Sequence, residues 1–499
     1  MLVTALALLA AEGSLADERY FAIQVVDDQT GRGVPLAELE TVNHVRLVTD
    51  SAGRVAFAEP GLMDQTVFFY VRSHGYEIPK DGFGYAGVRL KTTAGESATI
   101  KIQRRNIAER LYRATGEGIY RDSVLLDKRT PIAQPLLNAQ VAGLDSVQAA
   151  VHRGQIYWFF GDTQRPAYPL GHFGTAGAKS RLPGSGGLSP DRGIDFDYFR
   201  GDDGFSRPTC DWKTKHPVWI DGLLSVGDQE NQPRLLAHYS IMKSLGERLE
   251  HGLALFDEEK GAFEKLRVLD LSQPWQCPRE HPVRVKTGGG DFFYFLTPDA
   301  LVRAPARYEA LTTPESYECF SCLGDGSAVD DAVLLRDAGG KLRYRWTKDA
   351  PPVGQLGERR LLSSGKIEPE EAHWQVADAA TGKPVRMHNG SLTRNDYLGK
   401  WLWLAVESGG TSPLGEVWLA VADSPAGPWR KATKIVTHER YSFYNPAHLP
   451  FFDEQEGRII YFMGTYAETF SGNPVATPRY DYNQMVYRLD LADPRLRAE

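Results

Sequence analysis

The chain has 499 residues, which is long enough for two domains. Its 64 acidic and 57 basic residues leave a net charge of −7, and the basic residues form no tract. This balance argues against nucleic acid or an anionic membrane surface as a partner.

The first 16 residues resemble a secretory signal peptide. The segment MLVTALALLAAEGSLADE has a short apolar core, then small residues, and becomes polar at Asp17. It lacks a positive start, and its apolar run is too short to span a bilayer. We therefore expect cleavage near Ala16, no membrane span, and a mature protein that is secreted or periplasmic.

Residues 19–104 read as a separate small β-domain. Apolar and polar residues alternate with period two, and turns such as Asp-Gln-Thr-Gly and Asp-Ser-Ala-Gly interrupt the strands. The phrase VVDDQTGRGVPLAELE…TDSAGRVAF resembles the carboxypeptidase-regulatory-like, transthyretin-type β-sandwich, which implies a spacer or binding module without catalysis. Residues 105–139 read as a linker, within which 105–126 could supply a ring-closing strand to the last unit of the domain that follows.

Residues 140–491 repeat one pattern five times. An apolar strand is followed by a turn and then by a second strand rich in aromatic residues. The second strands are GQIYWFFGDT from Gly154, PRLLAHYSIM from Pro233, DFFYFLTP from Asp291, KWLWLAVES from Lys400 and GRIIYFMGTY from Gly457. Such long, irregular repetition of strand signals predicts an all-β fold, a five-bladed β-propeller. Its functional groups are then expected where the innermost strands begin, around the central channel.

Two aspartates open successive innermost strands in matching contexts. Asp145 lies in GLDSV and Asp221 in WIDGL, and both are flanked by apolar residues that enter the wall. Two carboxylates across a narrow cleft are what glycosyl transfer requires. The alternative is that each Asp caps a turn. Asp162, in FFGDTQ, is a further candidate that could equally form a turn.

Two glutamates of the fourth unit are candidates for a general acid. Glu407 ends WLWLAVES and Glu416 begins GEVWLAVADS. An apolar surround would raise the pKa of either carboxyl and suit it to donate a proton. The alternative is a salt bridge, for example to Arg394.

Other polar residues cluster at the remaining innermost strand starts and in a loop near the C-terminus. Histidine, tyrosine, asparagine and arginine side chains can hold sugar hydroxyls or stack on sugar rings. The predicted substrate-binding residues are His281, His388, Asn389, Tyr444, Asn445, His448, Arg479 and Tyr480, with Glu280 as a further acid.

Taken together, residues 140–491 resemble the five-bladed β-propeller glycoside hydrolases of the arabinanase and β-xylosidase type. In that group one acid of the first blade, one of the second and a glutamate of a later blade surround the scissile bond. By position the resemblance assigns Asp145 to the acid of the first blade and Asp221 to that of the second. The glutamate of a later blade would be Glu416 or Glu407. Within the third blade itself, the candidate is Glu280. The usual H-D-P opening reads L-D-S here.

The leading hypothesis is a glycoside hydrolase acting on a polysaccharide or oligosaccharide. Asp145 would serve as base or nucleophile, Glu416 as acid and Asp221 as the residue that tunes a neighbouring pKa. The alternatives are a non-catalytic carbohydrate-binding propeller of a glycan-uptake system and, less favoured, a polysaccharide lyase. No cofactor is required, although a structural Ca²⁺ fits the oxygen-rich channel. No H-E-x-x-H pair indicates catalytic zinc.

The four cysteines do not form a dense disulfide pattern. Cys319 and Cys322 make a single C-x-x-C, while Cys210 and Cys277 stand alone. One or two disulfides, or inert buried thiols, are favoured over a structural zinc site, which normally needs a second close pair.

Overall fold

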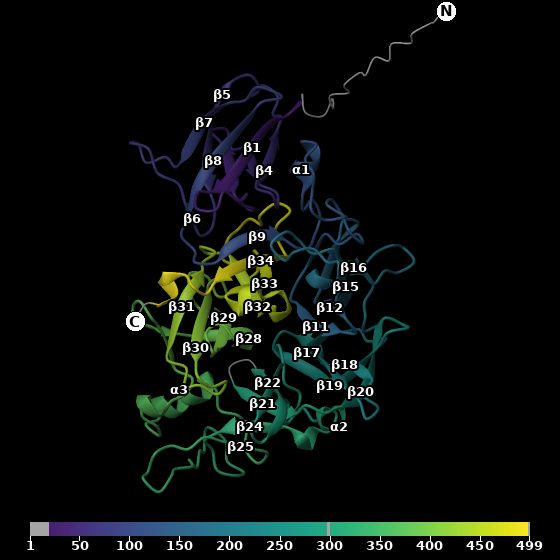
Figure 1. Ribbon diagram of the computed structural model, residues 1–499, viewed down its shortest axis with the longest axis vertical. Helices are drawn as coiled ribbons and strands as arrows, with labels where there is room; N and C mark the ends of the chain where they lie inside the picture. The colour runs from purple at the N-terminus through teal and green to yellow at the C-terminus, as the bar shows by residue number, and fades with distance from the viewer. Residues whose placement is uncertain (1–18, 297–299, 498–499) are drawn as a thin grey trace, which may run out of the picture. The chain divides into compact units, whose positions relative to one another are not determined.

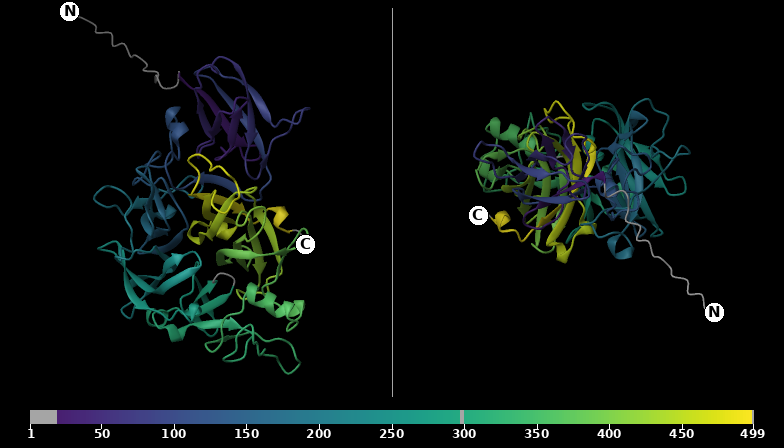
Figure 2. Two further views of the ribbon diagram at one scale, coloured as in Figure 1. Left: turned by 180° about the vertical axis from the view of Figure 1, so that it is seen from behind. Right: turned by 90° about the horizontal axis from the view of Figure 1, so that it is seen from above.

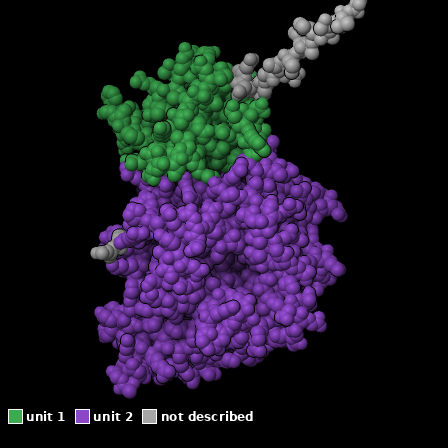
Figure 3. Space-filling view, viewed as in Figure 1, with its two compact units in different colours: residues 1–73, 77–103, 120–130 green, residues 74–76, 104–119, 131–499 purple. Residues whose placement is uncertain are grey.

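The computed structural model describes residues 19–296 and 300–497, so the expected signal peptide lies outside the described residues. The chain forms two compact units (Figure 3). Unit 1 comprises residues 1–73, 77–103 and 120–130, and unit 2 comprises residues 74–76, 104–119 and 131–499. Within the described residues, no helix has the length and apolarity that crossing a membrane requires.

Unit 1 is built from two four-stranded sheets whose buried faces meet. One sheet has the order β4 (Arg54–Phe57), β1 (Phe21–Asp27), β8 (Ser97–Arg104), β6 (Tyr76–Glu77), and the other β3 (Arg46–Val48), β2 (Glu38–Thr41), β5 (Thr66–Arg72), β7 (Gly87–Lys91). Burial alternates along β5, as expected for a strand with one covered face. Phe57 and Phe69, one from each sheet, meet edge to face at 5.3 Å. Helix α1 (Arg121–Leu125) is fastened to this unit, because Ser123 donates to the Asp50 carboxylate through its N–H and its hydroxyl, both at 2.7 Å.

Unit 2 is all-β in its main elements, and its larger sheets follow one another in chain order around a centre (Figure 1 and Figure 2, left). The first contains β11 (Gln148–His152), β12 (Gln155–Phe160), β15 (Ala176–Arg181) and β16 (Asp197–Tyr198). The second contains β17 (Val218–Gly227), β18 (Pro233–Ser244), β19 (Glu247–Asp257) and β20 (Ala262–Val268). The third contains β21 (Val283–Thr287), β22 (Gly290–Leu296), β23 (Leu301–Pro305), β24 (Glu318–Ser321) and β25 (Arg345–Thr347).

The fourth and fifth of these sheets draw on segments that are distant in sequence. The fourth has the order β27 (Pro384–Val385), β26 (Val376–Asp378), β31 (Lys431–Val436), β30 (Val417–Ala422), β29 (Lys400–Glu407), β28 (Met387–Asn395). The fifth has the order β32 (Ser442–His448), β33 (Ile459–Ala467), β34 (Asn483–Asp490), β9 (Glu109–Arg113). Strand β9 thus comes from the segment for which the sequence predicts a ring-closing strand, and it pairs antiparallel with β34.

Shorter elements connect the sheets of unit 2. A small sheet joins β10 (Gly143–Leu144), β13 (Thr163–Arg165) and β14 (Tyr168–His172), and the helices are α2 (Tyr308–Leu311) and α3 (Gln355–Ser363). Single 3₁₀ turns span Pro183–Ser185, Pro274–Gln276, Pro314–Ser316, Pro369–Glu371, Pro450–Phe452, Gln455–Gly457 and Pro494–Arg497.

The aromatic-rich second strands form the core because both of their faces are covered. Along β12, Trp158 and Phe160 pack with Tyr461 of β33, whereas Tyr157 and Phe159 pack with residues of β17–β19 in the second sheet. This explains why β12 and β33 are buried at nearly every position, as in strands covered on both sides, and do not alternate. Further apolar clusters join the second sheet to the third and the third to the fourth.

Tight hairpins set the register of these strands. Between β11 and β12 the turn residues Arg153 and Gly154 have φ of 47° and 74°. Two consecutive left-handed residues are what a two-residue hairpin of matching twist requires, and glycine adopts this conformation at little cost.

Candidate active site

A cavity of about 630 Å³ in unit 2 collects acids and hydrogen-bonding groups from the first strand of several sheets. The first strands of neighbouring sheets lie against each other here, β11 against β17 and β28 against β32. The acidic side chains in its lining are Asp145, Asp162, Asp221, Glu280 and Asp481. The other polar groups include Gln148, Trp219, Arg279, His281, His388, Asn389, Tyr444, Asn445 and Tyr482.

Irregular backbone brings these side chains into the cavity. Pairing of the first strand with the second is interrupted after Asp221, between Met387 and Gly390, and after Tyr444. An interruption of this kind bends a strand and redirects its side chains. Left-handed residues accompany these sites, with φ of 47° at Ser146, 58° at Gly222, 67° at Glu280 and 49° at Asn445. Such conformations cost about 1–3 kcal/mol each in non-glycine residues and often mark functional sites.

Asp145 lies just before β11 and is held by the backbone of Gly161, which directly follows β12. Its carbonyl accepts from the Gly161 N–H at 2.7 Å, and its Oδ2 accepts from the Tyr444 hydroxyl at 3.3 Å. A Cβ atom at Gly161 would stand 1.8 Å from Asp145 Oδ1, so only glycine leaves room for this carboxyl. Burial raises the pKa of Asp145 to about 7, the charge of Asp162 adds to the rise, and hydrogen bonds from Tyr482 and Tyr444 oppose it.

Asp162 is held by two donors close to Asp145. Its Oδ1 accepts from Trp219 Nε1 at 3.0 Å and from the Gly174 N–H at 3.1 Å. Burial raises the pKa of this carboxyl, while the two hydrogen bonds oppose the rise. Two carboxyl groups so close together disfavour the state in which both are ionised.

Asp221 and Glu280 form a second carboxyl pair. Asp221 Oδ1 lies 3.4 Å from both Gln148 Nε2 and the Glu280 backbone N, and the Gly222 N–H donates to the Glu280 carbonyl at 3.0 Å. Burial raises the pKa of Glu280 to about 8, and the Asp221 charge adds to the rise while Arg279 opposes it. Burial also raises the pKa of Asp221. A neutral carboxylic acid at pH 7 is able to donate a proton.

The remaining polar lining offers uncharged hydrogen-bonding groups. Burial lowers the pKa of His281 to about 4 and lowers that of His388, so both rings are neutral at pH 7. Asn389 Nδ2 donates to Asn445 Oδ1 at 2.9 Å, and Asn445 Nδ2 donates to the Ser146 hydroxyl at 2.8 Å. Gln148 Oε1, His388 Nδ1 and Asn389 Oδ1 are buried without a hydrogen-bond partner among the described residues. Such atoms are suited to sugar hydroxyls, because a buried polar atom without a partner is costly.

The structure therefore brings together most of the residues that the sequence singles out. Asp145, Asp162, Asp221, Glu280, His281, His388, Asn389, Tyr444 and Asn445 all line the cavity. Sequence reasoning did not single out Gln148, Trp219 and Arg279. Trp219 stands two residues before Asp221, and Arg279 stands directly before Glu280. This proximity to the predicted acids is the signal that could identify them.

Glu416 and Glu407 are outside the residues that line the cavity. Glu416 is buried, and its carboxylate accepts from the Thr411 N–H at 3.1 Å and from Lys434 Nζ at 3.2 Å. Glu407 accepts from Trp418 Nε1 at 2.8 Å. The salt-bridge interpretation thus applies to Glu416, with Lys434 as the partner and not Arg394, because the two strands β30 and β31 pair at this point.

Three predicted substrate-binding residues also lie elsewhere. His448 is buried between the Thr393 hydroxyl at 2.7 Å and Asp453 at 2.8 Å. Arg479 pairs with a glutamate of the segment after β9 at 3.5 Å. Tyr480 is buried, and the guanidinium carbon of Arg113 lies 4.6 Å from the centre of the Tyr480 ring. The neighbouring residues Asp481 and Tyr482 line the cavity instead.

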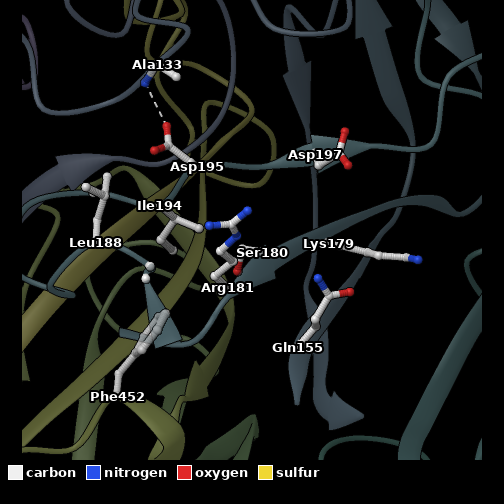
Figure 4. A pocket seen from close by; sticks show the side chains of 13 residues that line it. Ala133, Gln155, Lys179, Ser180, Arg181, Leu188, Ile194, Asp195, Asp197 and Phe452 are labelled. Carbon is white, nitrogen blue, oxygen red and sulfur yellow. Dashed lines mark hydrogen bonds between the residues drawn. The ribbon is translucent and has the colours of Figure 1, made fainter. Parts of the chain in front are cut away.

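A second cavity of about 480 Å³ in unit 2 lacks a buried carboxyl pair (Figure 4). Its lining includes Lys179, Arg181, Asp195 and Asp197, and both aspartates are exposed. Figure 4 shows Asp195 turned toward the Ala133 N–H, from which it accepts at 2.7 Å. Exposed carboxylates suit a solvated surface better than proton transfer.

Possible metal ligands are His, Cys, Asp and Glu side chains, and the possible thiol nucleophiles are the four cysteines. Within them, no group of three or more His, Cys, Asp or Glu side chains is gathered so that it could hold a metal ion. Cys210, Cys277, Cys319 and Cys322 are free and buried. Burial raises the pKa of each thiol, which makes all four poor nucleophiles at neutral pH.

Comparison with known proteins gives no family assignment. No family model matches the chain, and no curated protein matches it. Among solved structures, the GH43_1 enzyme from Xanthomonas citri complexed with xylotriose is 10% identical, with a TM-score of 0.35 over 71% of this chain and 88% of that one. An α-L-arabinofuranosidase from Fusarium graminearum is 13% identical, with a TM-score of 0.33 over 71% and 96%. At these scores the similarities carry no argument, and the interpretation of the site depends on its own residues.

Proposed function

We propose that this protein is a glycoside hydrolase whose active site is the cavity of unit 2, and that unit 2 is a five-bladed β-propeller. The observation that carries the proposal is the presence of two buried carboxyl groups, Asp145 and Glu280, whose pKa values are raised to about 7 and about 8 in one cavity. Glycosidic bond cleavage needs one carboxylate and one carboxylic acid on either side of the bond. Between these two pKa values the cavity supplies that combination.

The roles follow from the two pKa values. Glu280, with the higher value, is the general acid and gives its proton to the glycosidic oxygen as the bond from that oxygen to the anomeric carbon breaks. Asp145, with the lower value, is ionised first and acts on the anomeric carbon, either directly or by removing a proton from an attacking water. Asp221 keeps Glu280 protonated through its charge, and Asp162 acts on Asp145 in the same way.

The rest of the lining is suited to an uncharged sugar. Gln148, His388 and Asn389 present buried atoms without partners among the described residues, and Trp219 and Tyr444 add ring surface. Tyrosine and tryptophan combine such surface with a polar tip. A lyase acting on a uronate is disfavoured, because a further negative charge would enter a cavity lined by several acids. Among the described residues of that lining, Arg279 is the one strong cation.

A purely carbohydrate-binding propeller is the weaker alternative. Binding alone would not require carboxyl groups that are held away from their ordinary pKa range at a cost to folding. Export of the mature protein and a structural Ca²⁺ remain parts of the proposal that depend on the sequence.

The test is a screen for release of reducing sugars from arabinans, xylans, galactans, fructans and algal glycans. Asp145→Asn and Glu280→Gln are assayed beside the wild type, and Glu416→Gln serves as a matched control outside the cavity. We expect release by the wild type and by Glu416→Gln, and loss of release in the two cavity variants. Release that persists in Asp145→Asn or Glu280→Gln would refute the assignment of that residue. Saturable binding of a glycan without release would favour the binding propeller.

A further inference from the structure

Apolar side chains from separate loops gather at the same cavity as the acids. Phe173 follows β14, Leu245 lies in the hairpin between β18 and β19, and Phe470 follows β33. They are 63%, 73% and 43% exposed. Large apolar side chains that are exposed singly are ordinary in proteins, but several that line one hollow indicate a binding surface.

Other apolar residues line the same cavity. They are Pro169, Met242 and Leu414. Pro169 lies in β14, Met242 lies near the end of β18, and Leu414 lies in the connection between β29 and β30. Aliphatic side chains offer no hydrogen bond, so a sugar hydroxyl buried against them would lose its water without replacement. This part of the cavity therefore suits a group without hydroxyls.

The apolar part lies close to the catalytic acids. Phe470 meets the ring of Tyr444 edge to face at 5.9 Å, and the Tyr444 hydroxyl donates to Asp145. A ligand whose sugar reaches Asp145 thus has its attached group near Phe470. The polar and apolar parts together define one amphipathic ligand.

We propose that the substrate is a glycoside in which the sugar carries an apolar group, either an aryl or alkyl aglycone or an acyl substituent. Pro169, Phe173, Met242, Leu245, Leu414 and Phe470, together called the apolar rim, bind this group while the polar lining binds the sugar. The inference rests on the proposed function, since it identifies the substrate of the same site.

The first experiment measures binding to the full-length protein by calorimetry. The probes are methyl and n-hexyl glycosides of arabinofuranose, xylopyranose and galactopyranose, together with the acetylated methyl glycosides. We expect the hexyl form of the bound sugar to bind at least about tenfold more tightly than the methyl form, because each buried methylene group adds affinity. A matching gain for the acetylated form alone would identify an acyl substituent in place of an aglycone.

Two variants with a matched control locate the effect. Leu245→Asn and Phe470→Asn remove rim side chains that are substantially exposed, so folding should persist. Leu266→Asn makes the same chemical change on β20 at a leucine that is 42% exposed and does not line the cavity. We expect the first two variants to lose most of the hexyl preference over the methyl form, and Leu266→Asn to keep the preference of the wild type.

The outcomes separate this inference from the proposed function. Hydrolysis with equal affinity for methyl and hexyl glycosides would overturn the apolar rim and leave the hydrolase. A hexyl preference that depends on Leu245, without hydrolysis of any probe, would support the rim and overturn the hydrolase. Binding of neither form would overturn both.

Discussion

Replacing Glu280 by glutamine should abolish activity and stabilise the protein at alkaline pH. The side chain is 4% exposed, and burial together with the Asp221 charge raises its pKa to about 8 from the ordinary value of 4.5. A rise of about 3.5 in pKa corresponds to about 5 kcal/mol of destabilisation once the group is ionised in both states. Glutamine keeps the volume of the side chain and cannot ionise, so it removes this cost.

The sign follows from proton binding. Between pH 4.5 and pH 8 the folded wild type keeps the Glu280 proton and the unfolded chain releases it, so the free energy of unfolding falls as pH rises. This contribution to stability is present below pH 4.5 and is lost by the time the pH passes the folded pKa of about 8. We therefore expect Glu280→Gln to match the wild type near pH 5 and to exceed it near pH 9, by up to about 5 kcal/mol.

The assay is urea unfolding of both proteins at pH 5 and pH 9, with the slope and the midpoint fitted separately. Reducing-sugar release, measured on the same samples, should fall by a factor of about 10²–10⁴ if Glu280 is the general acid. A stability difference that is the same at both pH values would refute the raised pKa, and with it the argument that Glu280 is protonated at neutral pH. Activity that survives with a shifted stability curve would refute only the catalytic role.

Further predictions concern the same site. The pH dependence of kcat/KM should be bell-shaped, rising near pH 7 as Asp145 ionises and falling near pH 8 as Glu280 does, and an optimum near pH 5 would contradict the assignment. Asp162→Asn removes a charge that raises the pKa of Asp145, so the rising limb of that profile should move to lower pH, with an unmoved limb as the contrary result. Gly161→Ala places a methyl group where the Asp145 carboxyl lies and should therefore lower kcat. Thermal unfolding should still show a folded protein, and full activity would show that the carboxyl can move freely. Glu416→Gln should keep kcat and lose about 1 kcal/mol of stability with its partly exposed lysine pair, and loss of kcat would return this residue to the catalytic role expected from the sequence.

The sequence was informative about strands because their signal is local. The aromatic-rich segments from Gly154, Pro233, Asp291, Lys400 and Gly457 all form strands that pair on both sides. Each contains its own β-forming residues and is bounded by a turn, so no distant contact is needed to recognise it. The predicted starts of the first two inner strands lie three residues from the observed ones for the same reason, and Asp145 and Asp221 both lie in the cavity lining.

The choice among the glutamates could not be made from local sequence. Glu416 and Glu280 each stand shortly before a strand, β30 and β21, and neither segment reveals which group its carboxyl meets. The difference is the partner, because Lys434 reaches Glu416 across a strand pair while Asp221 lies beside Glu280. Such contacts join residues 18 and 59 positions apart, and they depend on strand register. The same holds for His448, whose partners Thr393 and Asp453 remove it from the site.

Two independent costs to folding are both present at the cavity. Ser146, Glu280 and Asn445 hold left-handed backbone, at about 1–3 kcal/mol each, and Asp145 and Glu280 hold carboxyl groups whose ionisation is disfavoured. Neither cost strengthens the sheets, since the strands pair regularly on either side of each interruption. If these positions served only packing, glycine at the left-handed residues and uncharged side chains in place of the carboxyl groups would remove both costs. The presence of two carboxyl groups with raised pKa values in this one cavity is accounted for if those groups transfer protons.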